Sequence, residues 1–156
     1  MTGSEIPAAG RGADALLGFD VGSRVIGVAV GNRLLGTARA LTTLGHRDGA
    51  PDWKRLDLLV REWQPQAFVV GLPLTLDGAE QPMSRRARDF AAVLERRYAR
   101  PVHAVDERYT SREAARRFAE RRARGALRRR DAEAIDTLAA EIILEAWFAE
   151  STDASN

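Results

Sequence analysis

Apolar and polar positions along the chain follow two different periods, and together they predict a mixed α/β fold. Short runs rich in Val, Ile and Gly predict strands over 16–21 and 25–30, and a third strand is predicted over 34–41. Because the connections between them are short, we expect these strands to form an antiparallel meander. Largely apolar runs at 67–73 and 101–107 predict two more strands, which the intervening helices would make parallel.

Four other segments carry apolar residues at helical spacing. They predict helices from Pro51 to Trp63, from Pro82 to Tyr98, from about Ser111 to Arg121, and from Asp131, as N-cap, to Phe148. The predicted fold class is α/β, with a mixed five-stranded sheet of three antiparallel strands followed by parallel strands, and helices on both faces. Ligands of such open sheets bind at the carboxyl ends of the parallel strands.

Length and composition fit one ordinary globular domain. The chain has 156 residues, of which 45% are hydrophobic and 29% charged. It has no apolar run near twenty residues, no secretory signal pattern and no cysteine, which excludes disulfides and thiol catalysis and favours the cytoplasm. We expect a flexible leader over 1–14, one domain over 15–150 and a flexible tail over 151–156. The sequence leaves the oligomeric state open between a monomer and a weak dimer.

The charge of the chain is unevenly distributed. The segment from Arg108 to Arg130 holds ten Arg and two Glu, a local net charge of +8, whereas the rest of the chain carries −6. A basic segment beside acidic residues suits a polyanion held near a metal site, such as nucleic acid, but charge alone does not favour this over the alternative. A solvated helical face is the alternative interpretation. Within this segment, the arginines that we expect to bind nucleic acid are Arg108, Arg112, Arg128, Arg129 and Arg130.

Asp20 stands inside an otherwise apolar strand, where an ionised carboxylate is costly unless something pairs with it. It is either a turn residue, bonded to the Gly22 amide, or a site residue. The predicted topology brings Asp106 and Glu107 to the same edge of the sheet, although a solvated strand end would also account for them. The loop residues Gly22, Gly71 and Pro73 lie at this edge too, where we expect them to border a substrate.

Asp136 supplies a third carboxylate from the last predicted helix. It lies at the edge of the apolar stripe of that helix, and small alanines one turn further on leave room for an ion or a substrate. Favourable interaction with the positive end of the helix is the alternative explanation. Three acids from two strands and a helix suit Mg²⁺ or Mn²⁺, because these hard cations prefer carboxylate and water oxygens. Neither histidine has the spacing of a zinc site.

Four segments of the sequence, "GFDVGSRVIGVAV", "VVGLPLTLDG", "VDERYTS" and "IDTLAAEIIL", resemble in order and spacing the signature segments of the YqgF/RuvX family. Members of this family are pre-16S rRNA nucleases similar to Holliday junction resolvases, and they have a ribonuclease H-like fold. The resemblance covers roughly residues 16–148. The residue before Asp106 departs from the pattern, since Val105 stands where relatives often carry an aromatic residue.

The resemblance implies that Asp20, Glu107 and Asp136 are catalytic and hold the metal, with Asp106 a weaker candidate. It also implies that Arg108 and the hydroxyls of Thr110 and Ser111 lie near substrate phosphates, and that the substrate is the 5′ end of precursor rRNA. The sequence leaves open a branched-DNA substrate, and also a nucleic-acid-binding factor without catalysis that acts on transcription. An Asp-x-Gly turn also opens the actin and sugar-kinase fold, but that fold needs two such domains and a second phosphate loop, which we do not expect in 156 residues.

Overall fold

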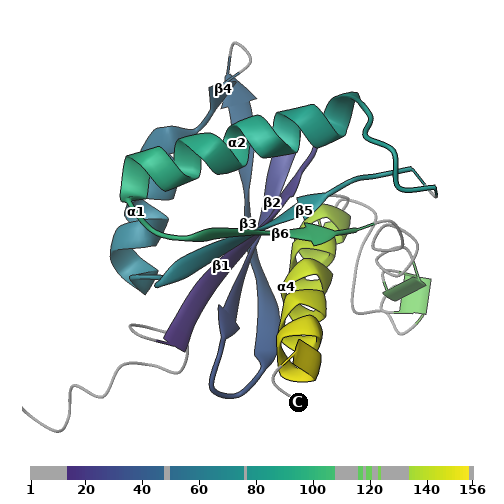
Figure 1. The fold of residues 1–156 in the computed structure, drawn as a ribbon. Helices are drawn as coiled ribbons and strands as arrows, with labels where there is room; N and C mark the ends of the chain where they lie inside the picture. Colours follow the sequence, from purple (N-terminus) through teal and green to yellow (C-terminus); the bar gives the residue numbers. More distant parts are fainter. Residues whose placement is uncertain are drawn as a thin grey trace, which may run out of the picture.

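The computed structural model describes residues 14–47, 50–75, 77–107 and 134–154, together with 116, 117, 119, 120 and 123. One six-stranded sheet, in the order β4-β3-β2-β1-β5-β6, forms the centre of the molecule (Figure 1). Its strands are β1 (Ala15–Val21), β2 (Val25–Asn32), β3 (Thr37–Arg47), β4 (Ala50–Pro51), β5 (Ala67–Leu72) and β6 (Val102–Asp106). Strand β1 pairs antiparallel with β2 and parallel with β5, and β6 runs parallel to β5. The predicted mixed sheet is therefore confirmed.

Strand β3 begins later than predicted because a turn occupies the start of the expected segment. The Gly36 amide donates to the Asn32 carbonyl at 2.8 Å, and Gly36 has a φ of +67°, which favours glycine. The Asn32 side chain also accepts from the Leu35 amide at 2.9 Å. Leu34 and Leu35 are apolar but 78% and 60% exposed, so their hydrophobicity does not report a buried strand.

The sheet has six strands rather than the predicted five because the chain before the first helix forms one more strand. Residues Ala50–Pro51 pair with the end of β3, with Pro51 opposite His46. The helix expected from Pro51 therefore begins as α1 (Trp53–Trp63), where the Asp52 side chain accepts from the Arg55 amide and caps the helix.

Helix α2 (Pro82–Tyr98) has the predicted bounds, whereas α4 (Ala134–Ala154) runs six residues past the predicted end. It thus continues into the segment expected to be a flexible tail. The predicted cap Asp131 and most of the predicted helix 111–121 lie outside the described residues, as does the leader up to residue 13. Those residues of the region that are described, from 116 to 123, are helical.

Helices α1 and α2 cover one face of the sheet and α4 covers the other (Figure 1). Each face carries its own hydrophobic core. Because side chains alternate along a strand, Leu17, Phe19 and Val21 of β1 face α1 and α2, and Leu16 faces α4. Helix α4 lies on the sheet face that also carries Asp20. No helix in the described part of the chain is long and apolar enough to cross a membrane.

Candidate active site

Asp20 lies on the α4 face of the central strand, near its carboxyl end, and is half-buried. Its partner in the β1–β2 ladder is Gly27. A Cβ atom at Gly27 would lie 2.1 Å from the backbone oxygen of Asp136, so only glycine allows the first turn of α4 to come this close to the sheet. This close packing places Asp136 next to Asp20.

Glu107 reaches the same site from the other side of β5. Its backbone amide donates to the Leu72 carbonyl at 3.1 Å, which extends the parallel pairing of β5 and β6 by one residue. A Cβ atom at Gly71 would lie 2.6 Å from Glu107 Oε2, so the missing side chain of Gly71 provides the space in which this carboxylate lies. Only 8% of Glu107 is exposed. The carboxyl group of Glu107 extends across β5 and forms a hydrogen bond with that of Asp20.

Burial is the main cause of the raised pKa values of Asp20 and Glu107. It raises the pKa of Asp20 above its ordinary value, and the nearby charge of Asp136 raises it further, while the hydrogen bond with Glu107 acts in the opposite direction. Burial also raises the pKa of Glu107, followed by the charge of Asp20, the hydrogen bond with Asp20 and the charge of Asp106. Both pKa values are thus raised, so the metal-free pair retains a proton to a higher pH than isolated carboxyl groups would.

Asp106 differs from Glu107 in its exposure. Its side chain is exposed, whereas that of its neighbour is buried. Successive strand residues point to opposite faces, and it is Glu107 that shares the α4 face with Asp20. Asp106 still lies close enough to raise the pKa of Glu107. The structure thus places Glu107 inside the acidic cluster and Asp106 at its edge.

The donor set of this cluster fits a hard divalent cation, because every donor is a carboxylate oxygen. Nevertheless, no group of three acidic or histidine side chains in the described ranges is already arranged to hold a metal ion.

The predicted loop residues border this edge of the sheet. Gly22 follows β1 in a tight turn, and its amide donates to the Val25 carbonyl at 3.0 Å. The Pro73 carbonyl accepts from the side chains of Gln81 and Ser84, which ties the end of β5 to the start of α2. The predicted phosphate-contacting residues lie outside the described residues: Arg108, Thr110, Ser111, Arg112, Arg128, Arg129 and Arg130.

One buried carboxylate near the site was not expected from the sequence. Glu141 of α4 is 7% exposed and accepts a hydrogen bond of 2.9 Å from the Ala40 amide, beside the register shift between β2 and β3. Arg117 contacts it at 3.4 Å and also pairs with Glu145 at 2.9 Å. An acid amid the apolar residues 138–144 is the signal that could have indicated such a buried contact.

Comparison with known proteins identifies the family of this chain. Residues 14–150 match the family described as "RuvX: Holliday junction resolvase", and the chain belongs to this family. A relative from Xanthomonas oryzae pv. oryzae is 53% identical over 134 residues, covering 86% of each chain. A relative from Xanthomonas euvesicatoria pv. vesicatoria is 50% identical over 153 residues, covering 97% of this chain and 99% of the relative. Each relative carries the name "Putative pre-16S rRNA nuclease".

The fold is also similar to that of solved RuvC structures. RuvC from T. thermophilus in complex with a Holliday junction substrate superposes with a TM-score of 0.51 at 19% identity, covering 88% of this chain and 95% of the other. A second RuvC structure from Thermus thermophilus gives a TM-score of 0.50 at 18% identity, covering 89% and 96%. At this level of identity the likeness concerns the fold alone, and it confirms the predicted ribonuclease H-like architecture.

Proposed function

We propose that this protein is a nuclease that uses Mg²⁺ or Mn²⁺ to hydrolyse phosphodiester bonds of precursor 16S rRNA. In this proposal it processes the 5′ end of that RNA in the cytoplasm, during ribosome biogenesis. The observation that carries the proposal is the buried Asp20–Glu107 pair beside Asp136, at the carboxyl edge of the sheet. Grouping three acids in a partly buried site is unfavourable unless a cation compensates their charge, and a phosphate substrate needs the same compensation.

Each acid has a distinct part in this proposal. Asp20 and Glu107 would hold the cation together with Asp136 of α4, because all three supply carboxylate oxygens. A divalent cation bound there lowers the pKa of a water molecule and stabilises the leaving oxygen. Asp106, which is exposed at the edge of the cluster, contributes negative charge to the site but is not required as a direct ligand. The Gly22 and Pro73 loops flank the substrate strand.

A branched-DNA substrate is the alternative, and the family description as a Holliday junction resolvase is the observation in its favour. The names of the relatives favour RNA instead. A binding factor without catalysis is less consistent with the site, because carboxylates repel phosphates in the absence of a cation.

The test is cleavage of labelled precursor 16S rRNA and of a four-way DNA junction side by side. Each reaction is run with Mg²⁺, with Mn²⁺ and with excess EDTA, and with the Asp20→Asn variant as the control for contaminating nucleases. We expect metal-dependent cleavage of the RNA at its 5′ end, which the variant lacks. Cleavage of the junction alone would identify DNA as the substrate instead of RNA. Cleavage that is unaffected by EDTA would contradict the proposed metal dependence.

A further inference from the structure

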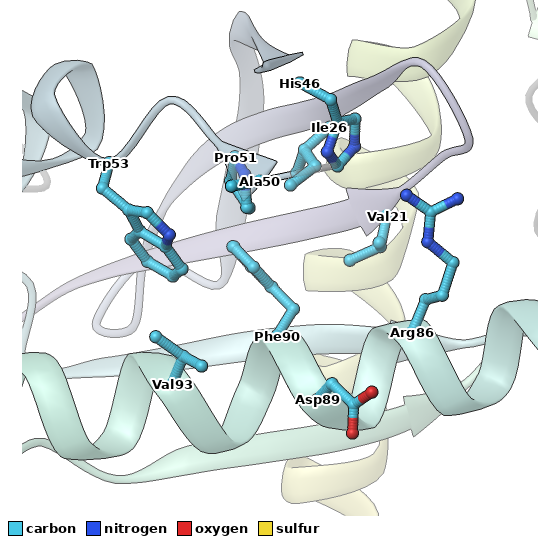
Figure 2. A pocket seen from close by; sticks show the side chains of 10 residues that line it. All are labelled: Val21, Ile26, His46, Ala50, Pro51, Trp53, Arg86, Asp89, Phe90 and Val93. Carbon is cyan, nitrogen blue, oxygen red and sulfur yellow. The ribbon is translucent and has the colours of Figure 1, made fainter. Parts of the chain in front are cut away.

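A cavity of about 240 Å³ lies on the opposite face of the sheet from Asp20, between the sheet and α2 (Figure 2). Val21 and Ile26 line it from the strands, and Phe90 lines it from the helix; all three are buried apolar residues. The rings of Trp53 and His46 form further walls. Its walls are therefore largely apolar and partly aromatic. Two charged residues of α2, Arg86 and Asp89, also line it, and Figure 2 shows the Asp89 carboxylate pointing away from the Arg86 guanidinium.

The aromatic walls of this cavity are held in place. The Trp53 ring stacks on Phe90 with 5.4 Å between ring centroids, and the Arg97 guanidinium lies 5.3 Å from the Trp53 centroid. His46 Nε2 lies 3.2 Å from the Gly22 carbonyl oxygen. Because a carbonyl only accepts, Nε2 must be the donor of this hydrogen bond. The cavity is thus pre-formed rather than dependent on a ligand to shape it.

The cavity begins one residue away from the acidic cluster. Val21 directly follows Asp20, and consecutive Cα atoms are about 3.8 Å apart. The two side chains point to opposite faces of the sheet, so the carboxylates lie on one side of the β1 end and the cavity on the other. A nucleic acid strand that crosses this edge would pass both features within a short length.

A cationic group stands beside the cavity. In Figure 2 the Arg86 side chain extends from α2 toward Val21. Arg88 pairs with Glu80 and Arg97 pairs with Asp57, but Arg86 forms no ion pair with any residue that the structure describes. An unpaired guanidinium next to an aromatic cavity is the combination that binds a phosphate and its neighbouring base in single-stranded nucleic acids.

We infer that this cavity receives one unpaired nucleobase of the substrate strand, with Arg86 on an adjacent phosphate. Its volume lies below the roughly 300–1,000 Å³ of pockets for drug-sized ligands, which suits a single base rather than a whole nucleotide. The base acts as an anchor that fixes the register of the strand and so determines which phosphodiester bond lies at the carboxylates. This inference rests on the proposed nuclease function and adds a specificity element to it.

The test combines a variant that narrows the cavity with removal of single bases from the ligand. Ala50 is an exposed residue on the cavity wall, so Ala50→Phe should fill space there without disturbing the core. The ligand is a labelled ten-nucleotide single-stranded RNA, and a series of abasic versions lacks one base at each position in turn. Binding is measured in EDTA, in the Asp20→Asn background, so that no cleavage intervenes.

We expect one abasic position to weaken binding at least about 5-fold, the lower end of the cost of losing one base–aromatic contact. In the Ala50→Phe protein that same position should no longer matter, because its base is already excluded. Arg86→Ala should also weaken binding, whereas Arg96→Ala should not. Arg96 is the matched control, since it lies on the same helix about 15 Å further along. Equal effects at all positions, or an abasic effect that persists in Ala50→Phe, would overturn the inference.

A second measurement separates this inference from the proposed function. In the cleavage assay with Mg²⁺ or Mn²⁺, the Ala50→Phe protein should cut at several neighbouring bonds where the unmodified protein cuts at one. If the unmodified protein cleaves RNA but the base removal and Ala50→Phe act independently, the base pocket is wrong and the nuclease stands. If the two are coupled in binding but no RNA is cleaved, the pocket stands and the nuclease proposal fails. Melting temperatures confirm that each variant is folded.

Discussion

Gly71 leaves open the space that the Glu107 carboxylate occupies: a Cβ atom on Gly71 would lie 2.6 Å from Glu107 Oε2. The same atom would lie 2.4 Å from the Ile143 side chain, so this one glycine accommodates both the acidic cluster and the packing of α4. The contact explains why the apolar strand β5 carries a glycine as its penultimate residue, directly beside the site. A substitution at Gly71 would therefore change the space around Glu107 without changing the charge of the site.

Gly71→Ala should therefore reduce activity without removing any carboxylate. The added methyl group displaces Glu107 and Ile143, and overpacking of this kind costs about 1–3 kcal/mol of stability. Gly45→Ala is the matched control, because a Cβ atom there meets nothing within 4 Å. The measurements are urea unfolding and metal-dependent cleavage well below the melting temperature. Full activity of a folded Gly71→Ala protein would show that the position of Glu107 is not critical.

Most of the fold could be predicted from the sequence because the chain has strong local signals. The bounds of α2 agree with its predicted range, since Pro82 at its start and the apolar spacing up to Tyr98 are unambiguous. The start of β3 could not be predicted in the same way. Leu34 and Leu35 look like strand residues, and only the turn geometry at Gly36 shows that they are exposed.

Only the outline of the candidate site could be predicted from the sequence. The topology predicts that Asp20 and the 106–107 pair share one edge of the sheet, but it does not tell which of Asp106 and Glu107 faces Asp20. The strand register decides this, because Glu107 lies on the same face as Gly71 and only glycine leaves room for it. Such a contact between distant residues leaves no periodic signal in the sequence.

Asp20→Asn should abolish cleavage and leave the fold intact. The substitution keeps the shape of the side chain, removes a half-buried charge and relieves repulsion with Asp136, so the metal-free protein should melt at a higher temperature at neutral pH. RNA binding in EDTA should persist. Glu107→Gln and Asp136→Asn should behave alike, and Asp106→Asn should be milder because Asp106 is exposed. Normal cleavage by the Asp20→Asn protein, or a much lower melting temperature of that protein, would identify Asp20 as a structural residue.

Glu141→Ala should destabilise the protein by about 1–3 kcal/mol, because it leaves the partly buried Ala40 amide without its acceptor. Glu141→Gln should cost less, since an amide oxygen can accept the same bond. Glu145→Ala serves as the control: it breaks only a partly exposed ion pair with Arg117, which is worth about 0–1 kcal/mol. The measurement is the free energy of unfolding of the three variants in urea. Equal effects of Glu141→Ala and Glu145→Ala would assign the stabilisation to the ion pairs instead.

The arginine-rich segment 108–130 should contribute to the salt dependence of RNA binding. If Arg128, Arg129 and Arg130 each contact a phosphate, their joint replacement by Ala should lower the slope of log affinity against log salt by about 2, at roughly 0.7 per phosphate on a single strand. Arg33→Ala provides a control, because Arg33 follows the end of β2 that is remote from Asp20. Filter binding between low and moderate salt gives the slopes. An unchanged slope in the triple variant would remove these arginines from the binding surface.

The acidic pair should make the metal-free protein less stable as the pH rises. In the folded state burial raises the pKa of Asp20 to about 6 and that of Glu107 to about 9, from 3.8 and 4.5. The folded state therefore holds more protons than the unfolded state between about pH 4 and pH 9. The stability that this protonation contributes is complete below pH 4 and is lost progressively as the pH rises toward 9. Melting temperatures in EDTA should fall across this range.

The decline should be smaller in Asp20→Asn, where one raised pKa is removed and Glu107 loses a charged neighbour. It should also be smaller with saturating Mg²⁺ or Mn²⁺, because a bound cation favours the ionised carboxylates. Identical pH profiles for the unmodified protein and Asp20→Asn would show that the titration of Asp20 does not contribute to this pH dependence.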